Sequence, residues 1–235
     1  MYCYPIFLKN KMGDIVIIDY GTGNIRSVFN SLKSAVEKKK IKKKVIVSDQ
    51  LKIINNSTHI ILPGVGSYKA CLSGLKGKPG LLDILNENVN IKMKPFLGIC
   101  VGMQMLANKG FEDGETDGLG WIDGKVNLID SKNDLLKVPH IGWNSLKKVS
   151  KHSFLDFIET NNSKEYLNDN SNAYFVHSYS FEVKYPENKI LVTDYDQEIT
   201  AMVGKANIIG TQFHPEKSQK FGQHFLTDFV LWDGR

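Results

Sequence analysis

Short apolar runs separated by turn residues dominate the first half of the chain. The run at 15–18 is followed by a glycine-rich turn, and segment 25–36 then places apolar side chains at helical spacing. Further apolar runs lie at 45–47, 60–62 and 95–98, as expected of short strands that are covered on both faces. This alternation predicts an α/β fold in which a parallel sheet carries helices on both faces.

The second half has a different pattern. It contains shorter β-rich segments and ends in one amphipathic helix, and these elements are expected at 121–129, 174–183, 190–193, 199–203 and 220–231. Because no Pro/Ser-rich linker separates the halves, we expect the later strands to be antiparallel or mixed and to complete the same sheet. We therefore predict one domain at 13–235, preceded by an N-terminal extension at 1–12.

Composition and charge narrow the function class. No apolar stretch reaches the ~18 residues of a membrane span. Cys3, Cys71 and Cys100 show neither disulfide nor metal-ligand spacing, which favours a reduced, cytoplasmic setting and no metal. Much of the net charge of +5 lies in the run 38–44, which lacks the interleaved aromatic residues of a nucleic-acid patch. We interpret this run as a solvated helix end and loop, and segment 161–172 as an exposed Asn-rich loop.

A candidate nucleophile stands in the middle of the chain. The apolar run at 96–99 leads through Gly98 to Cys100, and Gly102 opens a segment of small and apolar residues. This is the sulfur counterpart of a nucleophile elbow, in which a tight strand-to-helix turn lifts the nucleophile above the sheet. The helix N-terminus stabilises negative charge on the sulfur. A buried structural cysteine is the alternative for this motif taken alone.

A candidate base lies far downstream. His214 and Glu216 follow a predicted strand at 206–209 and are two positions apart, so their side chains leave an extended chain on the same side. The carboxylate can then hold one ring nitrogen while the other faces a nucleophile. Together, Cys100, His214 and Glu216 predict a catalytic triad.

A glycine-rich loop supplies the third component. Gly64, Val65 and Gly66 follow the apolar run at 60–62. Glycines allow backbone N–H groups to turn toward an anion, although an ordinary turn is the alternative. With the Val101 amide, which follows the nucleophile, Val65 and Gly66 are predicted to form an oxyanion hole.

These motifs resemble those of class I (triad) glutamine amidotransferases. The elbow at 98–104, the loop at 63–66 and segment 213–216 carry that resemblance. It implies a flavodoxin-like three-layer fold, with a central mostly parallel sheet between helices and extra antiparallel strands in the C-terminal half. It also implies no metal or organic cofactor.

A narrower resemblance points to one subfamily. Segments 18–25, 139–144 and 175–179, together with Lys217-Ser218, look like those of the glutaminase subunit of imidazole glycerol phosphate synthase. That enzyme hydrolyses L-glutamine through a cysteinyl thioester and passes ammonia to a cyclase subunit, which makes imidazole glycerol phosphate and an aminoimidazole carboxamide ribotide in histidine biosynthesis. The resemblance covers the chain from about Asp14 onward.

The resemblance also implies roles for further residues. The substrate-binding residues it implies are Gly64, Gln104, Glu112, Ser178 and Tyr179. The partner-interface residues it implies are Asn24, His140, Trp143 and Lys217, and the partner is the (β/α)₈ cyclase subunit. Trp143 is the kind of aromatic residue found at interface centres, with a core tryptophan as the alternative.

Three rival functions stay open at this point. The chain could be the glutaminase subunit of another triad amidotransferase, serving anthranilate, aminodeoxychorismate, GMP or pyridoxal phosphate synthesis. A non-catalytic binding subunit is disfavoured because nucleophile, base, orienting acid and glycine loop are all present. An elbow-cysteine peptidase or chaperone usually carries its histidine directly after the nucleophile, where this chain has Val101.

Overall fold

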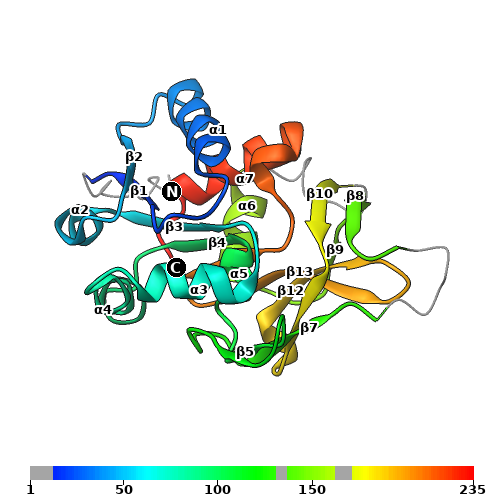
Figure 1. Ribbon diagram of the computed structural model, residues 1–235. Helices are drawn as coiled ribbons and strands as arrows, with labels where there is room; N and C mark the ends of the chain where they lie inside the picture. The colour runs from blue at the N-terminus through cyan, green and yellow to red at the C-terminus, as the bar shows by residue number, and fades with distance from the viewer. Residues whose placement is uncertain (1–12, 131–136, 162–170) are drawn as a thin grey trace.

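The computed structural model describes residues 13–130, 137–161 and 171–235 (Figure 1). The predicted N-terminal extension and most of the Asn-rich loop lie outside the described residues. None of the described helices is long and apolar enough to cross a membrane.

Within the described residues, the largest sheet has eight strands in the order β2-β1-β3-β4-β14-β13-β12-β9. The first five strands in this order are mutually parallel. They are β2 (Val45–Ser48), β1 (Ile15–Ile18), β3 (His59–Gly64), β4 (Phe96–Cys100) and β14 (Ile208–Thr211). The remaining strands pair antiparallel, and they are β13 (Glu198–Lys205), β12 (Lys189–Asp194) and β9 (Lys147–Lys148). Strands β1 and β3 are buried throughout, as the continuous apolar runs predicted.

Helices cover both faces of this sheet, which confirms the predicted α/β class (Figure 1). One face carries α1 (Ile25–Lys38), α6 (Ser153–Thr160) and α7 (Gln219–Leu231). The other carries α3 (Tyr68–Lys76) and α4 (Leu81–Asn86). Shorter helical elements are α2 (Leu51–Asn56), η1 (Glu87–Ile91), α5 (Val101–Gln104), η2 (Pro186–Asn188) and η3 (Pro215–Lys217).

The expectation that all later strands complete the same sheet is wrong. Among the described residues, β8 (His140–Ser145) and β10 (Asn172–His177) form a two-stranded sheet. A four-stranded sheet contains β5 (Lys109–Gly110), β6 (Thr116–Asp117), β7 (Gly124–Leu128) and β11 (Tyr179–Val183). The predicted strand 174–183 therefore breaks at Ser178, whose carbonyl accepts a hydrogen bond from Ile129, so pairing passes from β8 to β7.

The lysine run is only partly the solvated segment that was expected. Helix α1 ends at Lys38, and Lys39 and Lys40 are exposed. Lys43, however, donates to the carbonyl oxygen of Val230 at 3.0 Å. Burial lowers the pKa of Lys43 to about 8. One lysine of the run thus fastens the chain before β2 to the end of α7.

Candidate active site

The carboxyl ends of three adjacent parallel strands bring the predicted motifs together. Strand β4 lies between β3 and β14 and ends at Cys100. Strand β3 ends at Gly64, and β14 ends three residues before His214. The register pairs Gly64 with Cys100, so the glycine loop starts beside the nucleophile. Binding sites in open α/β sheets form at this edge.

Cys100 has the strained geometry of a nucleophile elbow. Its φ is 55° and its ψ is −113°, and α5 begins at the next residue. A side chain at Gly102 would collide with the carbonyl oxygen of Leu62, so the turn can approach β3 only because this residue is glycine. A Cβ at Gly64 would lie 2.5 Å from the Gly102 nitrogen. The elbow and the glycine loop are therefore packed backbone against backbone.

His214 is held by Glu216 and faces the nucleophile. Its Nδ1 lies 2.8 Å from Glu216 Oε1, and the Glu216 side chain is fully buried. The Nε2 atom of His214 is buried without a hydrogen-bond partner among the described residues. Burial lowers the pKa of the ring, but the Cys100 sulfur and the Glu216 carboxylate outweigh it and raise the pKa of His214 to about 10. The contacts with Cys100 and Glu216 thus favour the positively charged form of the His214 ring.

A cavity of about 420 Å³ opens at these residues. It unites the predicted catalytic, oxyanion and substrate residues except Glu216 and Gly64, and its lining is Val65, Gly66, Cys100, Val101, Gln104, Glu112, Pro139, Val176, His177, Ser178, Tyr179, His214 and Lys217. Among the described residues, no three His, Cys, Asp or Glu side chains gather in a way that could hold a metal ion.

Two backbone features concern the residues predicted to form an oxyanion hole, which line the cavity together with Cys100. Val101 is the first residue of α5, so its N–H has no acceptor within the helix. The carbonyl oxygen of Val65 accepts a hydrogen bond from the Cys71 thiol at 3.5 Å. This contact fixes the peptide plane between Val65 and Gly66, where Gly66 has a φ of 104°. The Gly66 N–H consequently points away from Cys71.

A family model described as "Glutamine amidotransferase class-I" matches residues 16–232. The chain belongs to the class I glutamine amidotransferases. This confirms the family predicted from the three motifs.

Two relatives have narrower names. The amidotransferase is 41% identical to "Imidazole glycerol phosphate synthase subunit HisH" of Brucella melitensis, over 93% of this chain and 98% of that protein. It is 44% identical to the protein of the same name from Pelagibacter ubique, over 92% of this chain and 99% of that protein. The narrower resemblance seen in the sequence is therefore confirmed.

Solved structures support the fold. A "glutamine amidotransferase" superposes with a TM-score of 0.63 at 17% identity, covering 92% of this chain and 99% of that one. A "putative gmp synthase subunit a" from Thermoplasma acidophilum has a TM-score of 0.60 at 16% identity, covering 93% of this chain and 92% of that one. The predicted fold of the amidotransferase is thereby confirmed.

Two predicted substrate residues make internal contacts that constrain their use. One oxygen of Glu112 accepts a hydrogen bond from the Tyr68 backbone at the start of α3, at 2.6 Å. Gln104 donates from Nε2 both to the Tyr179 carbonyl oxygen at 3.0 Å and to Gln212 Oε1 at 2.9 Å. Only the carbonyl end of the Gln104 side chain stays available to a ligand.

Sequence reasoning missed Gln212. This residue is fully buried, and its Nε2 lies 3.7 Å from Cys100 Sγ. The signal was present, because Gln212, His214 and Glu216 follow one another at spacings of two. The argument from extended chain would have included Gln212 with His214 and Glu216. That argument is wrong in its geometry, because the chain bends at 212–213 and Glu216 lies in the 3-10 helix η3 (Pro215–Lys217).

The predicted interface residues divide into two groups. Trp143 is 48% exposed, and the Lys217 ammonium lies 5.6 Å from the ring centroid of Tyr174, which contacts Trp143 edge-on. His140 and Asn24 make contacts inside the chain, and their role at an interface stays a prediction. His140 is buried, stacked between Phe175 and Tyr195, and the Asn24 side chain donates to Glu216 Oε1 at 3.4 Å. The His140 ring is therefore covered within this chain, whereas Asn24 is partly exposed.

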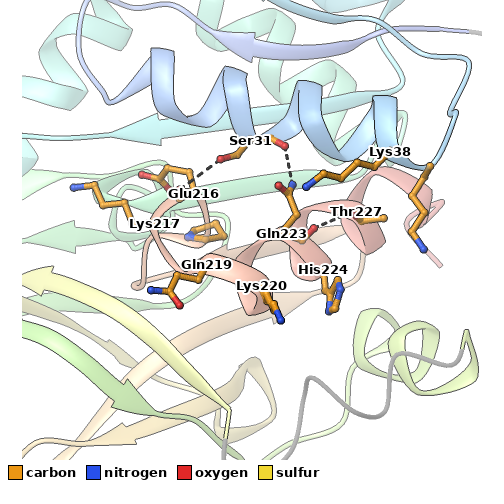
Figure 2. Close-up of a pocket in the computed structure, with 11 residues that line it drawn as sticks. Ser31, Lys38, Glu216, Lys217, Gln219, Lys220, Gln223, His224 and Thr227 are labelled. Carbon is orange, nitrogen blue, oxygen red and sulfur yellow. Dashed lines mark hydrogen bonds between the residues drawn. The ribbon is translucent and has the colours of Figure 1, made fainter.

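A groove between α1 and α7 lies on the outer side of the triad (Figure 2). There the Ser31 hydroxyl donates to the Glu216 carbonyl oxygen at 3.5 Å, and Gln223 donates to the Ser31 carbonyl oxygen at 2.9 Å (Figure 2). Lys38, Lys39, Lys217 and Lys220 line the same groove. The two helices thereby hold the loop that carries Glu216.

Proposed function

We propose that this amidotransferase is the glutaminase subunit of imidazole glycerol phosphate synthase and hydrolyses L-glutamine to glutamate and ammonia. The observation that carries the proposal is the His214 ring, which is bonded to Glu216 through Nδ1 and lines one cavity with Cys100. Two relatives covering more than nine-tenths of the chain bear that subunit's name.

The first half of the reaction forms a thioester. The Cys100 thiolate attacks the side-chain amide carbon of glutamine, and the carbonyl oxygen becomes an oxyanion. The Val101 N–H and an N–H of the turn at Val65–Gly66 stabilise this charge. His214 then gives its proton to the amide nitrogen, the C–N bond breaks and ammonia leaves.

The second half restores the enzyme. Neutral His214 takes a proton from water, and the resulting hydroxide attacks the thioester carbon. Collapse of the tetrahedral intermediate breaks the C–S bond, so Cys100 leaves as thiolate beside the recharged His214. The product carboxyl group ionises in water as glutamate. Glu216 keeps the ring oriented in both halves.

The cavity is suited to an amino acid with a charged backbone. Glu112 lines it with one carboxylate oxygen committed to Tyr68, and the other is assigned to the substrate ammonium group. The Gln104 carbonyl end and the backbone at Ser178–Tyr179 are assigned to the remaining polar groups of glutamine. Gly64 contributes indirectly by holding the loop against the elbow.

The partner is proposed to be the cyclase subunit, docked over the mouth of this cavity. Ammonia that escapes into water is protonated and lost to the second reaction, so a covering partner is required. Val65, which lines the cavity, is exposed, and so are Ile141 and Trp143 on β8, the strand that pairs with the cavity-lining Val176 and His177 of β10. Lys217, which lines the cavity, adds a positive charge to this surface.

A reduced, cytoplasmic location is consistent with the buried free thiols of Cys71 and Cys100.

The decisive experiment mixes this chain with a cyclase subunit and measures glutamate release with and without the cyclase substrate. Cys100→Ala should abolish release, whereas Cys3→Ala should leave it intact. Glutamate formation by the Cys100→Ala protein would refute the proposal. A second experiment expresses the chain in bacteria that lack the histidine-pathway glutaminase but have a competent cyclase. If growth is not restored, a glutaminase role in another pathway is favoured.

A further inference from the structure

The sulfur of Cys100 has a neighbour outside the triad. Gln212 Nε2 lies 3.7 Å from Sγ, within hydrogen-bond range for a sulfur acceptor. Both side chains are buried. Gln212 directly follows β14, and its backbone N–H is bonded to the Ala201 carbonyl oxygen at 2.9 Å. The amide group therefore approaches the nucleophile from the rigid central sheet.

The direction of the Gln212 amide follows from its neighbours. The Tyr179 carbonyl oxygen can only accept, so the Gln104 atom that contacts it must be the NH₂ group. That same NH₂ group meets Gln212 at 2.9 Å, so the Gln212 atom on that side must be its oxygen. The NH₂ group of Gln212 is then left facing Cys100. One backbone carbonyl thus orients two side-chain amides in sequence.

Resting on the proposed role of Cys100 as nucleophile, we propose that Gln212 is a hydrogen-bond donor to the Cys100 thiolate and stabilises the sulfur in its attacking position. A buried anion is costly unless it is paired and hydrogen-bonded. Gln212 supplies a donor that does not titrate, complementary to the charged ring of His214. Gln104 acts as a positioning residue because it holds the Gln212 oxygen.

The surroundings of the sulfur explain why such a donor matters. The Cys100 thiol donates to the Val176 carbonyl oxygen at 4.0 Å, a contact that exists only while the proton is present. Gln212 instead favours the sulfur after the proton has left. The Val176 contact therefore favours the thiol form of Cys100, and the Gln212 contact favours the thiolate. Removal of Gln212 leaves only the contact with Val176.

The contacts that hold the Tyr179 carbonyl oxygen extend into the two-stranded sheet of β8 and β10. The Tyr179 carbonyl oxygen also lies 2.9 Å from His177 Nδ1, so that nitrogen must carry the proton. His177 Nε2 lies 3.0 Å from His140 Nδ1. Burial lowers the pKa of His177 to about 3 and that of His140 to about 4, so both rings are neutral near pH 7. His177 Nε2 then accepts from His140, which fixes the Tyr179 carbonyl from a second side.

The test measures ionisation of Cys100 directly in the full chain. The rate of Cys100 alkylation by iodoacetamide is followed against pH, with the modified peptide quantified by mass spectrometry. Gln212→Met removes the donor, and Gln212→Glu replaces it with a group that repels a thiolate. The control is Gln50→Glu, an exposed position before α2 that makes the same chemical change. The titratable groups around the sulfur, unchanged in every variant, are His214, Glu216, His177, Glu112, Cys71, Tyr20, Tyr179 and Lys217.

The expected result is an upward shift of the alkylation midpoint by about one pH unit in Gln212→Met, as for loss of one charge-assisted hydrogen bond. The shift should be larger in Gln212→Glu and absent in Gln50→Glu. Midpoints that coincide with wild type in folded Gln212 variants would overturn the proposal.

If both Gln212 variants fail to fold, the pH midpoint of Cys100 alkylation is measured in Gln104→Met instead. Loss of the group that orients Gln212 should shift the midpoint upward by less than loss of Gln212 itself, and an unchanged midpoint would overturn the proposal. Alkylation requires neither glutamine nor a partner. A wild-type chain that releases no glutamate even with a cyclase subunit and its substrate would therefore refute the proposed function while leaving this test valid.

Discussion

Asn24 donates a hydrogen bond to Glu216, a residue 192 positions later in the chain, at 3.4 Å. The loop between β1 and α1 therefore helps to hold Glu216, the predicted acid of the triad. Asn24 also stands at the N-cap position of α1, but its side chain caps no backbone N–H of that helix. Its hydrogen-bonding capacity is directed at the active site rather than at the helix.

Asn24→Ala should lower kcat for glutamine hydrolysis about fivefold, as for loss of one long hydrogen bond worth about 1 kcal/mol. The melting temperature should barely change, because no helix cap is lost. Steady-state kinetics and thermal unfolding of the same preparations check both parts. Asn30→Ala, at an exposed position of α1, is the matched control. A kcat equal to that of wild type would show that Glu216 needs no help from this loop.

Stability should fall on the alkaline side of neutrality. Burial disfavours the charged His214 ring, yet Cys100 and Glu216 raise its pKa from 6.5 to about 10. The folded protein therefore binds this proton more tightly than the unfolded chain. The stabilisation is complete below pH 6.5 and is lost as the pH rises to about 10. Calorimetry should show a steeper decline of Tm over this window in wild type than in His214→Gln. Parallel curves would contradict the expected proton linkage.

Gly102→Ala should destabilise the protein by more than about 2 kcal/mol, the cost of forcing an atom into a packed backbone contact. The added methyl group would collide with the Leu62 carbonyl oxygen and push the elbow away from β3. Urea unfolding measures the loss. Gly77→Ala is the control, since the φ of Gly77 is −70° and its nearest neighbour, the Ser73 oxygen, lies 3.0 Å from the new atom. Similar losses in both variants would argue against a specific role for close packing at the elbow.

Trp143→Ala should weaken binding of the cyclase subunit about tenfold or more, as expected for a central aromatic residue of an interface. The isolated chain should keep its melting temperature, because the indole is 48% exposed. Isothermal titration calorimetry measures the affinity. Tyr185→Ala removes a comparably exposed aromatic side chain, 42% exposed, and serves as control. Equal affinities of the two variants would place the docking surface elsewhere.

The chemistry of the triad was readable from sequence because its information is local. A glycine-flanked cysteine after an apolar strand implies a turn that neighbouring backbone alone can build. His214 and Glu216 meet as expected, but through the 3-10 helix Pro215–Lys217 and not through the extended chain that their spacing suggested. The parallel half of the sheet was readable for the same reason, since fully buried strands such as β1 and β3 are continuous apolar runs.

Contacts between residues that are far apart in the sequence were decided only by the tertiary structure. Nothing local to Asn24 indicates that it meets Glu216, and nothing near His140 indicates that Phe175 and Tyr195 bury it. The break at Ser178 likewise depends on a hydrogen bond from Ile129 in another element. Periodicity encodes which face of an element is apolar, but it does not encode which partner covers that face. Packing makes that choice, because each buried polar group must find its hydrogen bond among whatever side chains the fold brings near.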